Sequence, residues 1–508
     1  MGNSPAGDLP TPIRVRYDPP VIRPKLAVHG HFYQPERRNP FTGEIVPQPA
    51  AAPFRDWNAR IDAECYKPNA EHGNLRHVSY DMGPTLADWL ATHDPATHQG
   101  FVDSDRPGLG ASPDGHILPA TADPAEGDAM AQAYHHAILP LASLADRRTE
   151  IRWGLRDFEL RFGRRPTGIW LPETAVDHAT LRILVDEGVR YTILAPWQAA
   201  DTRIDTRRPY RVELGRGKAI IVVFYDASLS ASASFESDAT MNADAFARER
   251  ILPRLAGPGF PDGSPKIAVI ATDGELYGHH QKFRDLFLAR LVNPGPDAPD
   301  RGFDITTVGA EVGAKAPGLF PATQVAERTS WSCHHGVLRW YAECPDAADG
   351  RWKGPLRVAL ERLASAIDTV AAGLAGEFMD PAALWPARDE YVDVIYGAET
   401  ADGFARRWLP LGDEAQRAGL MALMEIERWR LAMFASDGWF WGDPIRPETK
   451  QVLLCAAKSA RLADDMAGTS LEARLRDDLS LFVSPSRRID GAGIYDEALD
   501  EAGQPVEA

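Results

Sequence analysis

The sequence predicts an α/β fold: a parallel sheet or barrel over residues 25–315, followed by a region of α-helices. Short β-branched runs recur in the first part, and each stops at polar or aromatic residues: KLAV (25–28), TGIWL (167–171), YTIL (191–194), AIIVVF (219–224) and KIAVIA (266–271). Continuous apolar runs of this kind are typical of parallel strands buried on both faces. Between two of them, Leu181, Leu184 and Val185 share a helical face and Gly188 suits the helix end, which completes a βαβ rhythm.

Composition divides the chain into four predicted parts. Residues 1–24 are rich in proline and predict an irregular N-terminal arm, and residues 25–315 hold the strand runs of the barrel. Residues 316–475 predict an α-helical domain, with apolar residues at i, i+3 and i+4 spacing in segments 352–373, 381–411, 413–435 and 447–466. After Arg488 the chain has no Lys or Arg, so residues 476–508 predict a solvated acidic tail.

Charge and composition exclude several classes of function. The chain has 508 residues, a net charge of −17, 44% hydrophobic residues and four cysteines. An acidic chain is repelled by nucleic-acid phosphates and anionic membranes, and four cysteines do not make a disulfide scaffold. The sequence has no apolar leader and no run of about 18 apolar residues, the length that spans a bilayer. We therefore expect a cytoplasmic protein that binds neither nucleic acid nor membrane.

Polar and aromatic side chains follow the predicted strands. In a barrel of parallel strands the carboxyl ends meet at one rim, where chemistry is carried out. The rim is expected to collect His29, His31, Trp170, Glu173, Trp197, Asp226, Asp273, Glu275 and His279. A connection rich in Pro, Gly and Asp, at residues 94–127, is expected to loop over it.

Glu173 and Asp273 are the candidate catalytic pair. Each comes directly after a predicted buried strand, in IWLPETAVD and IATDGELYGHH. Two carboxyl groups that face one another suit glycoside cleavage, in which one protonates the leaving oxygen while the other attacks or activates water. The alternative is that each is an ordinary acidic residue at the start of a helix, where the helix dipole favours it.

Histidines supply a second set of candidates. In HGHFYQP (29–35), strand alternation places His29 and His31 on one face, where they could bind sugar hydroxyls or ligate a metal; the alternative is a hydrogen-bonded core histidine. In the pair His135-His136, one ring is expected to face the site, and His135 is taken as that residue.

Tryptophans beside polar residues form a third set. Trp331 and Trp340 lie in SWSCHHGVLRW, and Trp439 lies in ASDGWFWGDP. Sugar rings stack on indoles, although packing in a helical core is the alternative for each Trp. Cys333 and Cys344 lie near two histidines, but their spacing matches no common zinc pattern, so no metal and no cofactor are expected.

At these motifs the chain resembles glycoside hydrolase family 57, whose five short regions recur here in order. HGHFYQP (29–35) is similar to the first, and residues 134–140 (YHHAILP) through Trp153-Gly154 stand where the second is expected. GIWLPETAV (168–176) and ATDGELYGHH (271–280) look like the third and fourth. Ser436-Asp437 followed by Trp439 resembles the fifth, with Gly438 as an interruption. The elements SWSCHHGVLRW and MFASDGWFW look like an uncharacterised subgroup of the family.

This resemblance implies an incomplete (β/α)7 barrel with a C-terminal α-helical domain that contributes to the site. It also implies a retaining, metal-independent enzyme acting on an α-linked glucan or oligosaccharide. Glu173 would be the nucleophile and Asp273 the general acid/base, with carboxyl groups about 5–5.5 Å apart. The residues expected to bind substrate are His29, His31, Gln34, His135, Trp170, Trp197, Asp226, Glu275, His279, Trp331, Trp340, Asp437 and Trp439.

Three alternatives remain open at this point. The same site could transfer glycosyl groups, as a 4-α-glucanotransferase or glucan-branching enzyme, because hydrolysis and transfer differ only in what intercepts the intermediate. A metal-dependent polysaccharide deacetylase would need an Asp and two His converging on zinc, with His29 and His31 as the only start. A non-catalytic glucan-binding protein would need neither carboxylate. The oligomeric state is not predicted.

Overall fold

The computed structural model describes residues 23–105, 127–347 and 349–504. Most of the expected N-terminal arm lies outside this range, as does most of the connection at 94–127. The described start of that connection is helix α4 (Pro95–Ser104), which follows α3 (Pro84–His93). Its Asp94 N-cap accepts a hydrogen bond from the Thr97 backbone amide.

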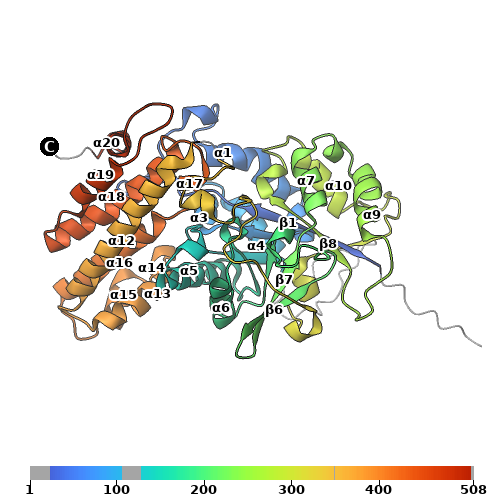
Figure 1. Cartoon of the computed structure of the whole chain (residues 1–508), viewed down its shortest axis with the longest axis horizontal. Helices are drawn as coiled ribbons and strands as arrows, with labels where there is room; N and C mark the ends of the chain where they lie inside the picture. Colours follow the sequence, from blue (N-terminus) through green and yellow to red (C-terminus); the bar gives the residue numbers. More distant parts are fainter. Residues whose placement is uncertain (1–22, 106–126, 348, 505–508) are drawn as a thin grey trace, which may run out of the picture.

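A curled sheet of ten strands forms the centre of the N-terminal part (Figure 1). Its strands are β1 (Lys25–Phe32), β2 (Ser79–Met82), β3 (Ala129–Gln132), β4 (Gly168–Trp170), β5 (Tyr191–Leu194), β6 (Tyr210–Gly215), β7 (Lys218–Phe224), β8 (Ile267–Asp273), β9 (Asp304–Thr306) and β10 (Ala322–Thr323). The order is β10-β6-β7-β5-β4-β3-β2-β1-β8, with β9 beside the start of β1, and all pairs are parallel except β6 with β7. The five predicted runs become β1, β4, β5, β7 and β8, and the expected fold class is confirmed.

Strand alternation separates two faces of the sheet. In β1, Leu26 and Val28 join the large core between sheet and helices, whereas Ala27 joins the cluster that includes Trp170 and Tyr191. His29 and His31 continue the face of Ala27, because side chains alternate along a strand. The register aligns His31 with Asp81 of β2 and with Asp273 of β8, so the carboxyl ends of three neighbouring strands meet at one level.

The sheet ends at the edge strand β8, and the segment after β7 that begins helix α7 (Ala227–Phe235) bonds to this strand. The Asp226 backbone amide donates to the Val269 carbonyl at 2.8 Å, and the Ser230 hydroxyl accepts from the Ala271 amide at 3.0 Å. Asp226 is also the N-cap of α7, since its carboxylate accepts from the Leu229 amide.

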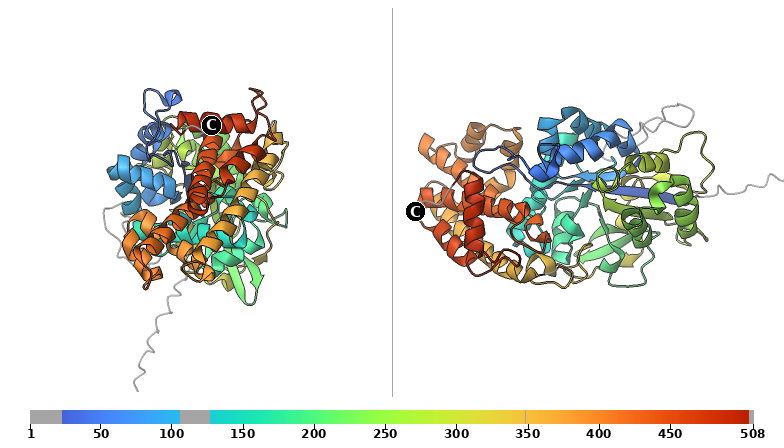
Figure 2. Two further views of the ribbon diagram at one scale, coloured as in Figure 1. Left: turned by 90° about the vertical axis from the view of Figure 1, so that its left-hand side faces the viewer. Right: turned by 90° about the horizontal axis from the view of Figure 1, so that it is seen from above.

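Helices surround the outer face of the sheet (Figure 2). They are α1 (Trp57–Ile61), α2 (Lys67–Glu71), α5 (Leu144–Phe162), α6 (His178–Asp186), α8 (Ala243–Phe246), α9 (Leu252–Leu255) and α10 (Arg284–Val292). Helix α11 (Val308–Val312) instead adds Val308 and Val312 to the cluster of Ala27 on the other face. One-turn π segments, Asp62–Tyr66 and Ala247–Ile251, join α1 to α2 and α8 to α9. Helix α6 matches the predicted amphipathic segment and begins after the N-cap Asp177.

The C-terminal helices gather at one end of the molecule, drawn orange to red in Figure 1. They are α12 (Lys353–Ala375), α13 (Leu384–Glu390), α14 (Val392–Tyr396), α15 (Ala401–Trp408), α16 (Glu414–Ala432), α17 (Asp437–Phe440), α18 (Pro447–Ala467), α19 (Leu471–Leu479) and α20 (Gly491–Glu501). They enclose a second hydrophobic core. The segment 381–411, expected as one helical stretch, is divided into α13, α14 and α15, and Gly397 ends α14 in a left-handed conformation.

Helix α5 joins the barrel to the helical core through buried charges. Arg388 of α13 donates to Asp146 of α5 at 3.0 Å and to Glu427 of α16 at 2.9 Å. The Trp153 indole of α5 donates to the Arg388 carbonyl at 2.8 Å. These groups are buried, so their pairing is required for the two cores to meet at this interface.

The acidic C-terminal segment differs from the expected solvated tail. Helix α20 buries Ile494, Tyr495 and Leu499 in the helical core, while Asp496 pairs outward with Arg476 at 2.7 Å. The acidic residues of this segment lie in an amphipathic helix, and the apolar face of that helix packs it against the helical core. Every helix within the described ranges is too short or too polar to cross a bilayer.

Candidate active site

Glu173 lies in a turn of unusual backbone geometry, directly after β4. Glu173 and Thr174 both adopt the left-handed conformation, with φ of 55° and 47°. This region costs a residue with a Cβ about 1–2 kcal/mol, so surrounding contacts must impose it. Gln198 does so: its amide donates to the Thr174 carbonyl and its oxygen accepts from the Thr174 hydroxyl, both at 2.8 Å.

The Glu173 carboxylate is bound by two donors from a segment far along the chain. The Trp331 indole donates to Oε2 at 3.1 Å, the Ser332 hydroxyl donates to the same oxygen, and the Trp331 amide donates to the Glu173 carbonyl at 3.0 Å. Burial raises the pKa of Glu173, the hydrogen bond from Ser332 lowers it, and the negative charge of Asp273 raises it again. Glu173 and Asp273 therefore lie within electrostatic reach of one another.

Asp273 is the last residue of β8 and its side chain is exposed, whereas Glu275, two residues later, is buried. A Cβ on the intervening Gly274 would lie 2.3 Å from the Phe32 ring, so only glycine allows this turn to pack against β1. Glu275 is buried and accepts from the Tyr66 hydroxyl at 2.6 Å and from the Tyr33 amide at 3.2 Å. Burial raises the pKa of Glu275 to about 7, with a further contribution from the charge of Asp273.

A buried carboxylate joins the two histidines of β1. Asp81 Oδ1 lies 3.1 Å from His29 Nε2, Oδ2 lies 2.8 Å from His31 Nδ1, and the Gln132 amide donates to Oδ2 at 2.8 Å. Burial disfavours a charged His31, but Asp81, Asp273 and Glu275 raise its pKa to about 9. Burial lowers the pKa of His29. The site thus holds one protonated and one neutral imidazole at neutral pH.

Stacked rings extend from this pair to the helical region. The rings of His29 and His31 stack on the ring of Trp170, with centroids 4.6 and 5.3 Å apart. The His136 ring stacks on the Tyr33 ring, with centroids 3.9 Å apart. At the far end, the Tyr33 hydroxyl donates to Asp437 Oδ2 at 2.6 Å. Burial raises the pKa of Asp437 to about 6, and the charge of Asp437 in turn raises the pKa of Glu173. Asp437 therefore belongs to the same electrostatic environment as Glu173.

Histidine 136, rather than His135, lies beside the site. The His136 ring lies 5.4 Å from that of His31, and its Nδ1 forms a 2.7 Å hydrogen bond with the Ser436 hydroxyl. His135 points away, where its Nδ1 lies 2.8 Å from Glu150 Oε1. The backbone of His136 is left-handed, with φ of 57°, so the directions of the side chains of His135 and His136 do not follow the alternation of an extended strand.

Other expected residues lie around the site or outside it. Trp197 is 42% exposed and donates to the Ser330 carbonyl, next to Trp331. His279 pairs with Glu64 at 2.6 Å. Gln34 accepts from Arg37 at 2.7 Å. Asp226 is fully buried as a helix cap and as a partner of Arg254 at 2.7 Å, which is a structural position.

Two tryptophans belong to the helical core and not to the Glu173 environment. Trp340 and Trp439 are at most 1% exposed and belong to the hydrophobic core of the C-terminal helices. The Trp439 indole donates to the Lys353 carbonyl at 3.3 Å. Their alternative role as helix-packing residues therefore prevails. Trp331 alone of the three touches a catalytic candidate.

Three residues of the site were not singled out from the sequence, Tyr33, Asp81 and Ser332, whereas His136 was named in a pair from which His135 was chosen. Tyr33 and Ser332 adjoin residues that were, so proximity to a motif was the available signal. Asp81 is the third residue of the short strand SYDM, whose four residues carry too weak a β pattern to predict.

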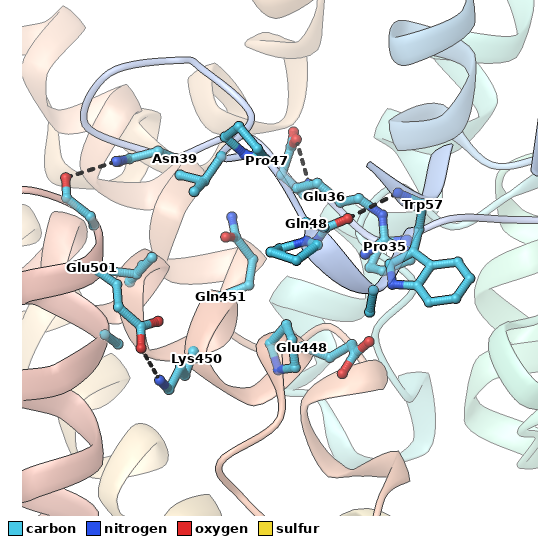
Figure 3. Close-up of a pocket in the computed structure, with 18 of the residues that line it drawn as sticks. Pro35, Glu36, Asn39, Pro47, Gln48, Trp57, Glu448, Lys450, Gln451 and Glu501 are labelled. Carbon is cyan, nitrogen blue, oxygen red and sulfur yellow. Dashed lines mark hydrogen bonds and ion pairs between the residues drawn. The ribbon is translucent and has the colours of Figure 1, made fainter. Parts of the chain in front are cut away.

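A pocket of about 430 Å³ lies beside the site, between the segment after HGHFYQP and helices α18 and α20 (Figure 3). Pro35, Glu36 and Trp57 line one side, and Glu448 and Gln451 line the other. Its lining includes neither catalytic candidate, so it is an adjoining space and not the reaction centre.

Comparison with known proteins identifies two parts of the chain. Residues 126–294 match the family described as glycosyl hydrolase family 57. This range contains both catalytic candidates and confirms the recognition from the motifs, and with it the class of glycoside-hydrolysing or glycosyl-transferring enzymes. Residues 349–504 match a family described as a domain of unknown function (DUF3536), and this range contains Asp437. No match was found among curated protein sequences.

Solved structures share the fold across nearly the whole chain. An exo-type maltose-forming amylase from Pyrococcus sp. ST04 aligns over 90% of this chain and 82% of its own, with 15% identity and a TM-score of 0.67. A family 57 branching enzyme from Pyrococcus horikoshii covers 95% of both chains at 17% identity and a TM-score of 0.57. The α-amylase AmyC from Thermotoga maritima covers 93% and 99% at 14% identity and a TM-score of 0.52. At these identities the likeness establishes the fold.

Proposed function

We propose that this protein is a retaining glycoside-acting enzyme whose substrate is an α-linked glucan or oligosaccharide. The observation that carries the proposal is the Glu173 carboxylate, which is held on a strained turn by Trp331 and Ser332 and faces the charge of Asp273. The sugar substrate is supported by the family match and by the glucan-acting names of the similar structures.

In the first step, Glu173 attacks the anomeric carbon while Asp273 protonates the leaving oxygen. Both donors bind Oε2, so within the described part of the chain Oε1 has no donor and is the oxygen that attacks. Asp273 is exposed at the end of its strand, which gives it access to the glycosidic oxygen. Protonation of the leaving group and bond formation to Glu173 together yield a covalent glycosyl-enzyme.

In the second step, Asp273 removes a proton from water or from an acceptor sugar, and the glycosyl-enzyme ester is cleaved. His31, protonated at neutral pH, supplies a positive charge that favours the ionised form of Glu173. The aromatic faces of Trp331 and the exposed Trp197 suit stacking with sugar rings. Hydrolysis and glycosyl transfer both use this chemistry, and the incoming hydroxyl distinguishes them.

The deacetylase alternative is not favoured. His29, His31 and Asp81 do converge, but each imidazole engages a different oxygen of Asp81. Among the described residues, these three are not a set whose ligand atoms all lie within 4.8 Å of one another. The arrangement is instead a buried ion pair with a second imidazole, which orients His31 toward the rim.

The test is a screen of α-glucans and oligosaccharides with wild type, Glu173→Gln and Asp273→Asn. We expect both variants to lose the same activity, and NMR of the first-formed product to show the anomeric configuration of the substrate. A fluorinated glycosyl donor should add one sugar mass to the peptide that contains Glu173. Inverted product, or full activity in Glu173→Gln, would overturn the mechanism. Longer maltooligosaccharide products would indicate transfer, and only shorter ones hydrolysis.

A further inference from the structure

The segment that binds Glu173 continues into a cluster of thiols, imidazole and carboxylate. Cys333, His335, Cys344 and Asp346 each offer one ligand atom, and these atoms all lie within 4.8 Å of one another. The cluster lies between the two family matches, the first of which ends at residue 294 and the second of which begins at residue 349. It begins one residue after Ser332, whose hydroxyl donates to Glu173.

The interatomic distances match the edges of a tetrahedral metal site. Cys333 Sγ lies 3.5 Å from Cys344 Sγ, Cys344 Sγ lies 3.6 Å from His335 Nδ1, and His335 Nδ1 lies 3.3 Å from Asp346 Oδ2. Zinc bonds of about 2.3 Å to sulfur, 2.05 Å to nitrogen and 2.1 Å to oxygen give tetrahedral edges of about 3.8, 3.6 and 3.4 Å. These three edges agree with a site for one zinc ion, and the other three pairs of ligand atoms lie within 4.8 Å of one another.

The surroundings suit a centre of net negative charge. Two thiolates and one carboxylate around a divalent cation leave a net charge of about −1. Lys353 is fully buried close by, and its Nζ has no hydrogen-bond partner in the described ranges. Burial lowers the pKa of Lys353 to about 8, while the thiols of Cys333 and Cys344 act in the opposite direction. A metal centre would supply the negative charge that this buried ammonium lacks.

The carboxylate ligand is also oriented by the backbone. The His334 amide donates to Asp346 Oδ2 at 2.7 Å, and the Ala347 amide donates to the Cys344 carbonyl at 2.9 Å. Both hydrogen bonds join residues within the loop 333–347 and so restrict its conformation. Hydrogen-bonded carboxylate ligands of this kind are typical of metal centres.

We propose that Cys333, His335, Cys344 and Asp346 bind one divalent zinc-class ion in tetrahedral geometry. The ion is structural and fixes the loop that presents Trp331 and Ser332 to Glu173; this positioning role rests on the proposed function. Two thiolates with one imidazole select zinc over magnesium or calcium, which prefer oxygen ligands. Binding releases the thiol protons to solvent and oxidises nothing.

The experiment measures metal binding in the full-length, reduced protein. We expect about one zinc ion per chain after purification, removable by chelator and restored by Zn²⁺ alone. Co²⁺ alone, added to the stripped protein, should give a thiolate-to-cobalt charge-transfer band and the visible bands of a tetrahedral site. His335→Asn and Asp346→Asn, whose side chains are partly exposed, should weaken zinc binding about tenfold or more. Cys333→Ser with Cys344→Ser should abolish the charge-transfer band.

Matched controls separate this site from its surroundings and from the reaction. Cys455→Ala alters a buried cysteine of α18, outside the cluster, and should keep one metal ion. Glu173→Gln should keep the metal while losing activity, so failure of the proposed function would not be mistaken for failure of the site. A wild type that binds no more Co²⁺ than the double cysteine variant would overturn the proposal. A Cys333–Cys344 disulfide whose reduction restores no metal binding would also overturn it. If the stripped protein keeps its kcat/KM, the positioning role is wrong.

Discussion

Removing the Ser332 hydroxyl tests whether the loop at 331–346 controls the ionisation of Glu173, the proposed nucleophile. Ser332 donates to Glu173 Oε2, and this bond lowers the pKa of Glu173 against the opposing effects of burial and of Asp273. A hydrogen bond to a charged group contributes about 1.5–3 kcal/mol, so Ser332→Ala destabilises the ionised carboxylate by about that amount. In the proposed mechanism only the ionised form of Glu173 attacks, so the acid limb of the pH–rate profile should move to higher pH.

The magnitude of the effect depends on the pH of the assay. Below the acid limb, kcat/KM is proportional to the ionised fraction of Glu173, and a cost of about 1.5–3 kcal/mol lowers it roughly 10- to 150-fold. Above the limb both enzymes are ionised and the loss is smaller. The measurement is kcat/KM on a maltooligosaccharide over the pH range in which the protein stays folded.

Ser330→Ala is the matched control for this prediction. Ser330 lies on the same segment, but its hydroxyl donates to the Gly336 carbonyl at 2.6 Å and does not contact Glu173. We expect the control to keep the acid limb of wild type. The reasoning is refuted if Ser332→Ala leaves the acid limb in place, or if both variants move it equally.

Three stability predictions follow from buried groups. Asp81→Asn deprives the buried His31 imidazolium of its counter-charge and should lower the free energy of unfolding by about 3–5 kcal/mol at pH 6, measured by urea denaturation. Because the pKa of His31 is raised from 6.5 to about 9, this contribution is complete below pH 6.5 and is lost as the pH rises through 9. A difference in unfolding free energy between variant and wild type that stays constant from pH 6.5 to 9 contradicts the pairing. Gly154→Ala places a Cβ 1.8 Å from a backbone carbonyl of β3 and should cost about 3 kcal/mol or more, whereas Gly373→Ala, on the open side of α12, should stabilise by up to about 1 kcal/mol. Arg388→Ala removes one of the two arginines that pair with the buried carboxylates of Asp146 and Glu427, and leaves Glu427 with Arg430 at 3.9 Å. It should cost about 3 kcal/mol in thermal or urea unfolding, with a change below about 0.5 kcal/mol as the contrary result.

Much of the barrel could be predicted because its signals are local. The β-branched runs ended within a few residues of the observed strands, and the helix before Gly188 began at its capping Asp177. Short strands such as SYDM were missed, since four residues carry little periodicity. The acidic segment after Arg488 was misjudged because charge was weighed above the apolar face of α20.

The site was predicted less evenly, for a physical reason. Glu173 and Asp273 follow strands directly, so strand order alone brings them to one rim. The choice between His135 and His136 depended on a left-handed backbone that no neighbouring residue type predicts. Asp437 contacts the site through its hydrogen bond with Tyr33, a residue more than 400 positions earlier in the chain.

The sequence by itself determined the strand ends, the two carboxylates and the family, because each resides in a few consecutive residues whose periodicity and chemistry are visible locally. Only the tertiary structure decided which side chains share the environment of Glu173. It brought Trp331 and Ser332 to that carboxylate, buried Asp81 between two histidines, and left Trp340 in the helical core. These outcomes depend on packing between segments separated by tens to hundreds of residues, and such contacts leave no local pattern in the chain.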